Sequence, residues 1–177
     1  TLKKHDLEVC WEVVNNDSET MYFTIGGHPA FRVPVREGES QSDYRLAFEG
    51  LDTLTYLLID TSVGTVLADE PHTLSLENGT CSIAPHMFDK DALVFDNGQI
   101  QKAGILFPDG TPYLTLTSEG FPNFGIWSVP GAPFVCLEPW MGRCDDCGFE
   151  KPLSEKANIN VLKPDEEFIK SYQITVH

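Results

Sequence analysis

Positive charge is scarce in this sequence: 12 lysine and arginine residues stand against 27 aspartate and glutamate residues, and the formal net charge is −15. Nucleic-acid binding depends on clustered basic side chains, and anionic membrane surfaces also attract basic segments. No apolar run reaches the ~20 residues of a membrane span, and the N-terminus "TLKKHDLEVCW" has no signal-peptide pattern. The composition therefore predicts a cytoplasmic protein with neither nucleic acid nor a membrane as partner.

The cysteines form no evident disulfide framework or metal motif. Five are present, at positions 10, 81, 136, 144 and 147, and an odd count without a secretory signal indicates reduced thiols. Cys144 and Cys147 form a C-x-x-C motif, but a structural zinc site needs about four ligands, and neither a second such motif nor a histidine pair lies nearby. A redox motif would need a βαβ context. No metal and no cofactor are expected, and the role of Cys144 and Cys147 stays open.

Helical periodicity is also missing, because no segment keeps an apolar 3.6-residue period over three turns. The best helical candidate is a single turn at residues 85–92. Many short strands separated by dense turn signals predict instead one all-β domain over residues 1–177, an antiparallel β-sandwich or a barrel. The expected strands are residues 7–14, 20–25, 44–48, 54–59, 72–76, 113–118, 124–129, 133–138, 159–163 and 168–176.

The segment "TIGGHPAF", residues 24–31, places a histidine inside a broken apolar run. Gly26 and Gly27 permit a bulge or a close backbone approach, and Pro29 removes a backbone donor and so interrupts regular pairing. A histidine at such a broken strand can direct its ring into a concave face. The alternative is a core or turn histidine that binds backbone, and the residues alone leave both interpretations of His28 open.

The segment "PFVCLEPWMGRCDD", residues 133–146, places a glutamate after an apolar strand. We expect Pro139 to end this strand, so that Glu138 lies at its buried end. Desolvation there would raise the pKa of Glu138 toward the range of a general base, and Trp140 offers a flat apolar face suited to a sugar ring. A solvated glutamate at the end of a strand is the alternative.

Two further segments contain candidate ligand-binding residues. In "HMFDKDALVF", residues 86–95, Asp91 precedes an apolar strand and could accept hydrogen bonds from ligand hydroxyl groups. The alternative is a capping or turn aspartate, which suits Asp89 better. In "FPNFGIWS", residues 121–128, Trp127 is either a core residue or a wall of a sugar site.

In this order, "FTIGGHPAFRVP", "MFDKDALVF" and "FPNFGIWSVPGAPFVCLEPWMG" resemble the aldose 1-epimerases, or galactose mutarotases, and most closely the LacX-like branch that includes hexose-phosphate mutarotase-related proteins. The resemblance implies a large antiparallel β-supersandwich and an isomerase that interconverts the α and β anomers of an aldohexose. By position, it implies that His28 is the general acid, Glu138 the general base and Asp91 a substrate-binding residue. The acid and base are expected on opposite sides of the sugar, and Trp140 would form a pocket wall.

Members of this family are longer than 177 residues, and the chain corresponds to the C-terminal part of their pattern. The resemblance implies that an N-terminal portion supplies further strands, an arginine and sometimes a second histidine. A sandwich without that portion exposes edge strands, which a homodimer would cover. The alternative function is a non-catalytic carbohydrate-binding domain on the same fold.

The expected ligand is a small sugar: galactose, glucose or a hexose phosphate. Four basic residues near the main motifs are candidates for a phosphate group. They are Arg32, Arg36, Arg143 and Lys151.

Overall fold

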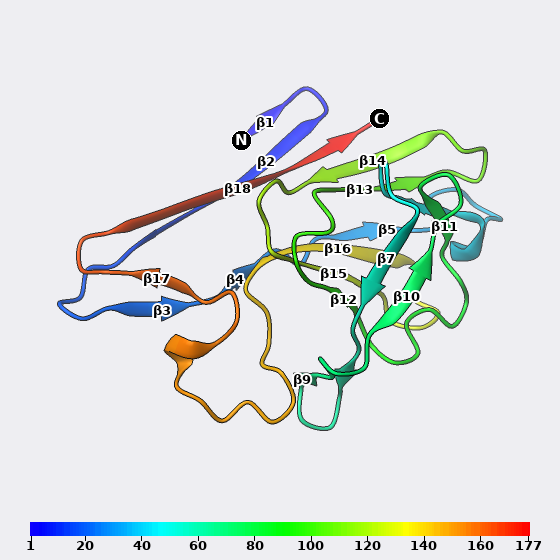
Figure 1. The fold of residues 1–177 in the computed structure, drawn as a ribbon. Coiled ribbons are helices and arrows are strands. Elements are labelled where there is room, and N and C mark those ends of the chain that lie inside the picture. The colour runs from blue at the N-terminus through cyan, green and yellow to red at the C-terminus, as the bar shows by residue number, and fades with distance from the viewer.

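The computed structural model describes all residues from 1 to 177 and contains two main antiparallel sheets (Figure 1). The larger sheet has seven strands in the order β1-β2-β18-β14-β13-β6-β11. Its strands are β1 (Leu2–Lys3), β2 (Asp6–Val14), β18 (Glu167–Val176), β14 (Pro112–Thr117), β13 (Lys102–Leu106), β6 (Arg45–Ala47) and β11 (Thr80–Ser82).

The second sheet has the order β12-β15-β16-β4, and β5 also pairs with β16. Its strands are β12 (Leu93–Phe95), β15 (Asn123–Trp127), β16 (Phe134–Met141), β4 (Ile25–Gly26) and β5 (Ala30–Arg32). Three two-stranded pairs complete the fold: β7 (Thr53–Tyr56) with β10 (His72–Ser75), β8 (Ile59–Asp60) with β9 (Thr65–Val66), and β3 (Met21–Phe23) with β17 (Asn160–Leu162). The helical elements are the 3₁₀ turns η1 (Gln41–Asp43) and η2 (Leu153–Glu155).

The two main sheets enclose one hydrophobic core, so the predicted all-β antiparallel sandwich is confirmed. The core cluster combines buried side chains from both sheets, including Leu116 and Ile174 of the larger one and Phe124 and Leu137 of the smaller one. Alternation explains which side chains of a strand are buried, because successive residues point to opposite faces of the sheet. In β14, for example, Leu114 and Leu116 are buried and the residues between and beside them are not.

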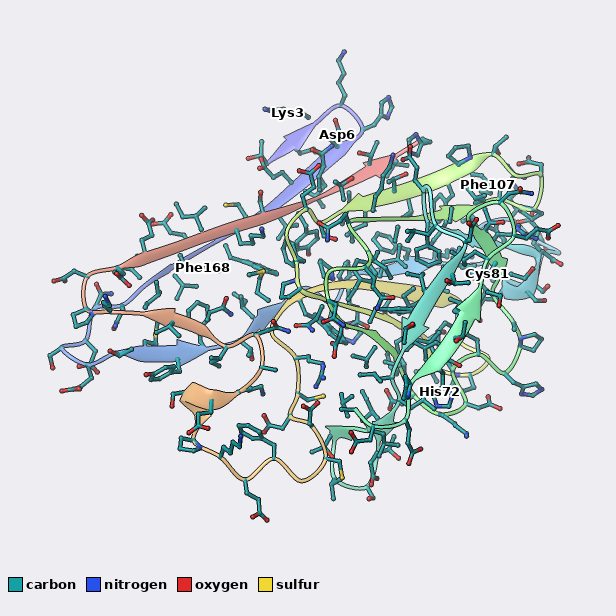
Figure 2. All side chains as sticks on the ribbon, in the orientation of Figure 1. Lys3, Asp6, His72, Cys81, Phe107 and Phe168 are labelled. Carbon is teal, nitrogen blue, oxygen red and sulfur yellow. The ribbon has the colours of Figure 1, made fainter.

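A long ribbon of β2 and β18 extends beyond the sandwich, and the β3–β17 pair runs beside it (Figure 1). Phe168, labelled in Figure 2, lies on the side of the ribbon that faces this pair. Its ring meets the ring of Phe23 edge-on, with 5.3 Å between centroids. This aromatic contact packs the β3–β17 pair, which leads directly into β4, against the ribbon.

All ten expected strands contain strand residues, but two details of the prediction were wrong. Of residues 85–92, residues 85–90 form consecutive hydrogen-bonded turns rather than a helical turn, with Met87 N bonded to Ala84 O and Asp91 N bonded to Phe88 O. Pro139 does not end a strand, because β16 continues through it to Met141. No helical segment has the length and apolar character that a membrane span requires.

Candidate functional site

Strand β16 separates a core face from a site face. Val135 and Leu137 are buried in the core cluster, whereas Cys136, Glu138 and Trp140 point to the opposite side of the sheet. Along "FVCLEPWM", residues that pack in the core therefore alternate with residues that face the candidate site. The sequence predicted that Glu138 would lie at the end of the strand. In the structure it lies in the strand interior.

A break in the neighbouring strand accommodates the proline. Strand β4 pairs with β16 at Trp140, and β5 pairs with it at Cys136, so residues 27–29 form an interruption opposite Pro139. The N–H of Gly27 donates to the Pro139 carbonyl at 2.9 Å. The carbonyl oxygen and the nitrogen of one antiparallel strand residue point toward the same neighbouring strand. The Pro139 nitrogen, which carries no hydrogen, therefore points to the interruption, where no strand residue needs its hydrogen bond. The same gap gives His28 access to the site face.

The two glycines before His28 are required for close approach. A Cβ at Gly26 would lie 2.4 Å from Cδ1 of Trp140, and a Cβ at Gly27 would lie 2.8 Å from the hydroxyl oxygen of Tyr172. Gly26 therefore faces the site and Gly27 faces the core. His28 follows on the site side, with its side chain 58% exposed and its ring meeting Trp127 edge-on at 5.6 Å between centroids.

Glu138 and His28 are in direct contact. Nδ1 of His28 lies 3.1 Å from Oε1 of Glu138, and Glu138 is only 5% exposed. Burial raises the pKa of Glu138 to about 7, hydrogen bonding by Trp140 opposes this shift, and the negative charge of Asp91 adds to it. The acid and base candidates thus stand side by side rather than on opposite sides of a ligand.

Asp91 enters the site from the turn before β12. Its backbone lies in the left-handed region, at φ 74°, which non-glycine residues seldom occupy although aspartate tolerates it. Its Oδ1 accepts a hydrogen bond from the N–H of Ala92 at 2.6 Å, and its Oδ2 is available to a ligand. This backbone geometry holds a carboxylate close to Glu138.

Trp140 lies across the sheet in a cradle formed by glycines. A Cβ at Gly125 would lie 2.3 Å from Cζ2 of the indole, and Gly26 contacts the other end of the ring. Gly26 and Gly125 belong to the two strands that flank β16. Glycine on both sides therefore lets the indole lie flat beside Glu138.

We expect Gly125→Ala to destabilise the protein by about 1–3 kcal/mol and to change tryptophan emission, because the new methyl group must displace the Trp140 ring. Urea unfolding and fluorescence spectra measure both effects. Gly104→Ala is a control for the emission, since Gly104 is also a strand glycine whose Cβ would crowd the backbone oxygen of Leu114, at 3.2 Å, and not Trp140. A Gly125→Ala protein with the stability and the emission spectrum of the wild type would contradict the cradle.

All four predicted site residues line one pocket of ≈ 550 Å³. Sequence reasoning missed several other lining residues, among them Thr61 and Gly64 from the β8–β9 turn and Cys144 after β16. Nothing in the sequence marks the β8–β9 turn as a neighbour of β16, because only the tertiary fold brings them together. The half-buried Trp127 packs against His28 and Phe134 and is not among the lining residues.

Arg143 also lines the pocket, but carboxylates already engage its guanidinium group. Its side chain is 8% exposed, and Nη2 lies 2.7 Å from Asp96 and 2.8 Å from Asp146. Burial alone would lower the pKa of Arg143, yet the hydrogen bonds to Asp96 and Asp146 raise it. The other phosphate candidates, Arg32, Arg36 and Lys151, are not among the lining residues.

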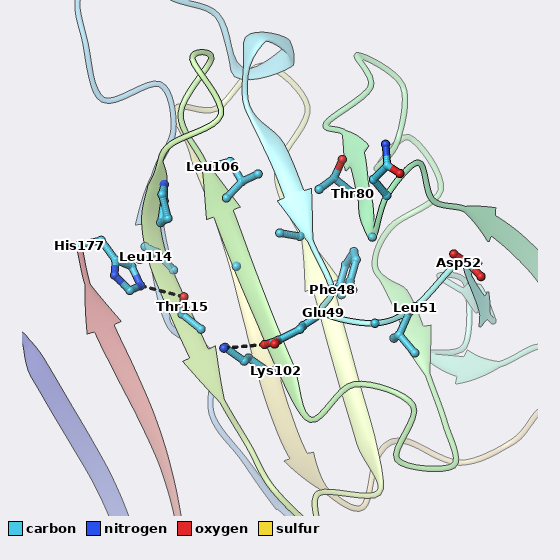
Figure 3. A pocket seen from close by; sticks show the side chains of 16 residues that line it. Phe48, Glu49, Leu51, Asp52, Thr80, Lys102, Leu106, Leu114, Thr115 and His177 are labelled. Carbon is cyan, nitrogen blue, oxygen red and sulfur yellow. Dashed lines mark hydrogen bonds and ion pairs between the residues drawn. The ribbon is translucent and has the colours of Figure 1, made fainter.

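A second pocket of ≈ 620 Å³ lies over β6, β13 and β14 of the larger sheet (Figure 3). Four of its polar side chains are engaged in pairs: Lys102 pairs with Glu49 at 2.8 Å, and His177 lies 3.0 Å from the Thr115 hydroxyl. None of the predicted site residues lines it. The pocket around Glu138 is therefore the better candidate for chemistry.

Known proteins resemble this chain in sequence and in structure, although no family model matches it. The plasmid-encoded protein LacX of Lactococcus lactis subsp. lactis is 29% identical over 179 residues, which cover 99% of this chain and 60% of LacX. The chain thus spans about 60% of the length of the curated relatives it matches.

Two solved structures extend the comparison. The galactose mutarotase related enzyme from Lactobacillus acidophilus has a TM-score of 0.89 and 27% identity, covering 99% of this chain and 59% of that one. A galactose mutarotase-like protein from Lactobacillus casei has a TM-score of 0.79 and 26% identity, covering 96% and 58%. The resemblance to the galactose mutarotase-like proteins and to their LacX-like branch is confirmed.

Proposed function

We propose that this chain carries the acid–base site of an aldose 1-epimerase, an isomerase that interconverts the α and β anomers of an aldohexose. The observation that carries the proposal is the 3.1 Å contact between His28 Nδ1 and Glu138 Oε1 in a pocket that Asp91 and Trp140 also line. The likeness to a galactose mutarotase related enzyme supports the choice of reaction.

The reaction requires two proton transfers on neighbouring oxygens. Glu138 takes the proton of the C1 hydroxyl, while protonated His28 gives a proton to the ring oxygen, and the bond between C1 and the ring oxygen breaks. Both oxygens are bonded to C1, so two adjacent side chains can reach them. After the aldehyde turns, closure on its other face reverses both transfers, and the total number of protons on the pair is unchanged.

The surroundings of the pair favour a neutral sugar over a sugar phosphate. Asp91 supplies a carboxylate oxygen for sugar hydroxyl groups, and the Trp140 indole offers an apolar face for the ring. The cationic Arg143 is already paired with Asp96 and Asp146. A phosphate would have to compete with these carboxylates for the guanidinium group.

Polarimetry of freshly dissolved α-galactose and α-glucose tests the proposal. We expect the chain to accelerate mutarotation above the rate of the weakly buffered solution, and tryptophan fluorescence to report sugar binding. Binding without acceleration, by a protein that unfolds cooperatively, would contradict the proposal. It would favour the alternative of a non-catalytic carbohydrate-binding domain, which has a use for Asp91 and Trp140 but not for a proton-sharing pair.

A further inference from the structure

Three side chains with different metal-ligand atoms converge where His28 contacts Glu138. A ring nitrogen of His28, the sulfur of Cys136 and a carboxylate oxygen of Glu138 all lie within 4.8 Å of one another. We propose that this cluster binds a divalent cation that accepts nitrogen and sulfur ligands, with Zn²⁺ as the best fit, and that the bound ion inhibits the site. The inhibition, unlike the binding, rests on the proposed function.

The sheet presents the three ligand atoms without a large rearrangement. Cys136 and Glu138 are two residues apart on β16, so both point to the site face, and His28 reaches them from the break in the neighbouring strand. Ligand atoms around tetrahedral zinc are about 3.3–3.6 Å apart, given bond lengths of about 2.0–2.3 Å. The His28–Glu138 separation is already 3.1 Å, so modest side-chain rotations would complete the geometry.

The charges of these ligands suit a divalent cation. A neutral imidazole, a thiolate and a carboxylate together carry two negative charges, which cancel the charge of Zn²⁺ in a place where an uncompensated charge would be costly. Cys136 is 0% exposed and Glu138 is 5% exposed. A coordinating thiol gives up its proton to solvent when the metal binds.

One coordination position stays open toward the pocket. The His28 side chain is 58% exposed, so an ion can enter beside it and keep a water molecule as its fourth ligand. Cys144 and Cys147, which form the C-x-x-C motif of the sequence, are not members of the cluster. Two of the ligands come together because Cys136 and Glu138, two residues apart on β16, share one face of the sheet. The C-x-x-C motif plays no part.

An ion in this place would stop proton transfer. It would occupy the Glu138 oxygen that accepts a proton and a ring nitrogen of His28 that exchanges one. Zinc should therefore act against the sugar reaction rather than assist it.

Cobalt(II) titration tests binding directly, because a Co²⁺–thiolate bond absorbs in the near ultraviolet and needs no activity to be seen. We expect the band in the wild type and in Cys147→Ser, whose thiol is exposed and outside the cluster. Cys136→Ser should lose it. A band missing from the wild type, or retained in Cys136→Ser, would overturn the site.

A second variant keeps the test decisive if Cys136→Ser fails to fold. His28→Gln removes a nitrogen ligand at a largely exposed position and should weaken cobalt binding by roughly tenfold or more. Unchanged affinity in His28→Gln would exclude the histidine as a ligand and overturn the three-ligand site.

Mutarotation rates test the inhibition separately. Each protein is compared with its own metal-free rate, and zinc should inhibit the wild type and Cys147→Ser at concentrations that leave Cys136→Ser less affected. A cobalt band together with a zinc-insensitive rate would overturn the inhibition. If the metal-free chain has no activity, the proposed function fails, while the cobalt titration still decides the metal site.

Discussion

Replacement of Glu138 by glutamine is expected to lower kcat for mutarotation by about 10²–10⁴-fold, the usual contribution of a general acid–base group. Glutamine keeps the shape of the side chain and can still contact His28, but it cannot accept the proton of the C1 hydroxyl. Sugar affinity should change little, because Asp91 and Trp140 remain. Polarimetry gives the rate, and tryptophan fluorescence gives the affinity.

Asp89→Asn provides a matched control for this carboxylate-to-amide change. Asp89 is exposed, contacts His86 at 2.9 Å and does not line the pocket, so its variant should keep the wild-type rate. His28→Asn should lose activity in the same direction as Glu138→Gln. A Glu138→Gln protein that retains a near-wild-type rate would show that Glu138 is not the base.

Local patterns were sufficient to predict the fold class, and the family resemblance indicated His28, Glu138 and Asp91, which line one pocket with Trp140. The strand signals were local, because alternating apolar residues and turn residues mark each segment independently of the rest of the chain. Short strands such as β11 and β13 escaped prediction: one reads "TCS" and the other contains Gly104. Their strand geometry depends on pairing with β6 rather than on local preference.

The position of Pro139 inside a strand could not be predicted from the local sequence, because it depends on the pairing of β16 with distant strands. Proline is uncommon inside a central strand because it cannot donate a ladder hydrogen bond. A strand end was therefore expected at Pro139. The structure keeps Pro139 inside β16 because β4 and β5 are separate strands with a gap opposite it. The same gap positions His28, so one long-range feature accounts for both the wrongly predicted strand end and the contact between His28 and Glu138.

The roles of the glycines in the site could likewise be predicted only in part from the sequence. A glycine pair before His28 indicates close approach in general terms, but the sequence does not say what approaches. In the structure, Gly26 makes room for Trp140 and Gly27 for Tyr172, on opposite faces of the chain. Gly125, far along the sequence, completes the cradle for Trp140, and only the register of β15 against β16 reveals that role.

Glu138→Gln is also expected to make the folded protein more stable than the wild type at pH 8. Burial raises the pKa of Glu138 from its ordinary value of 4.5 to about 7. Below pH 4.5 the carboxyl group is protonated in both the folded and the unfolded state. Between pH 4.5 and 7 the unfolded state loses this proton while the folded state retains it, so the stability of the wild type falls as pH rises.

At 1.36 kcal/mol per pKa unit, the fall amounts to roughly 3 kcal/mol across this window. Glutamine does not titrate, so the difference in unfolding free energy between variant and wild type should grow by about that amount between pH 4.5 and pH 8. Urea unfolding at several pH values measures it, and the titration of all other carboxyl groups cancels in the difference. A difference that stays constant with pH would contradict a buried, proton-holding Glu138. An inactive variant that is more stable than the wild type would assign the lost activity to proton transfer rather than to unfolding.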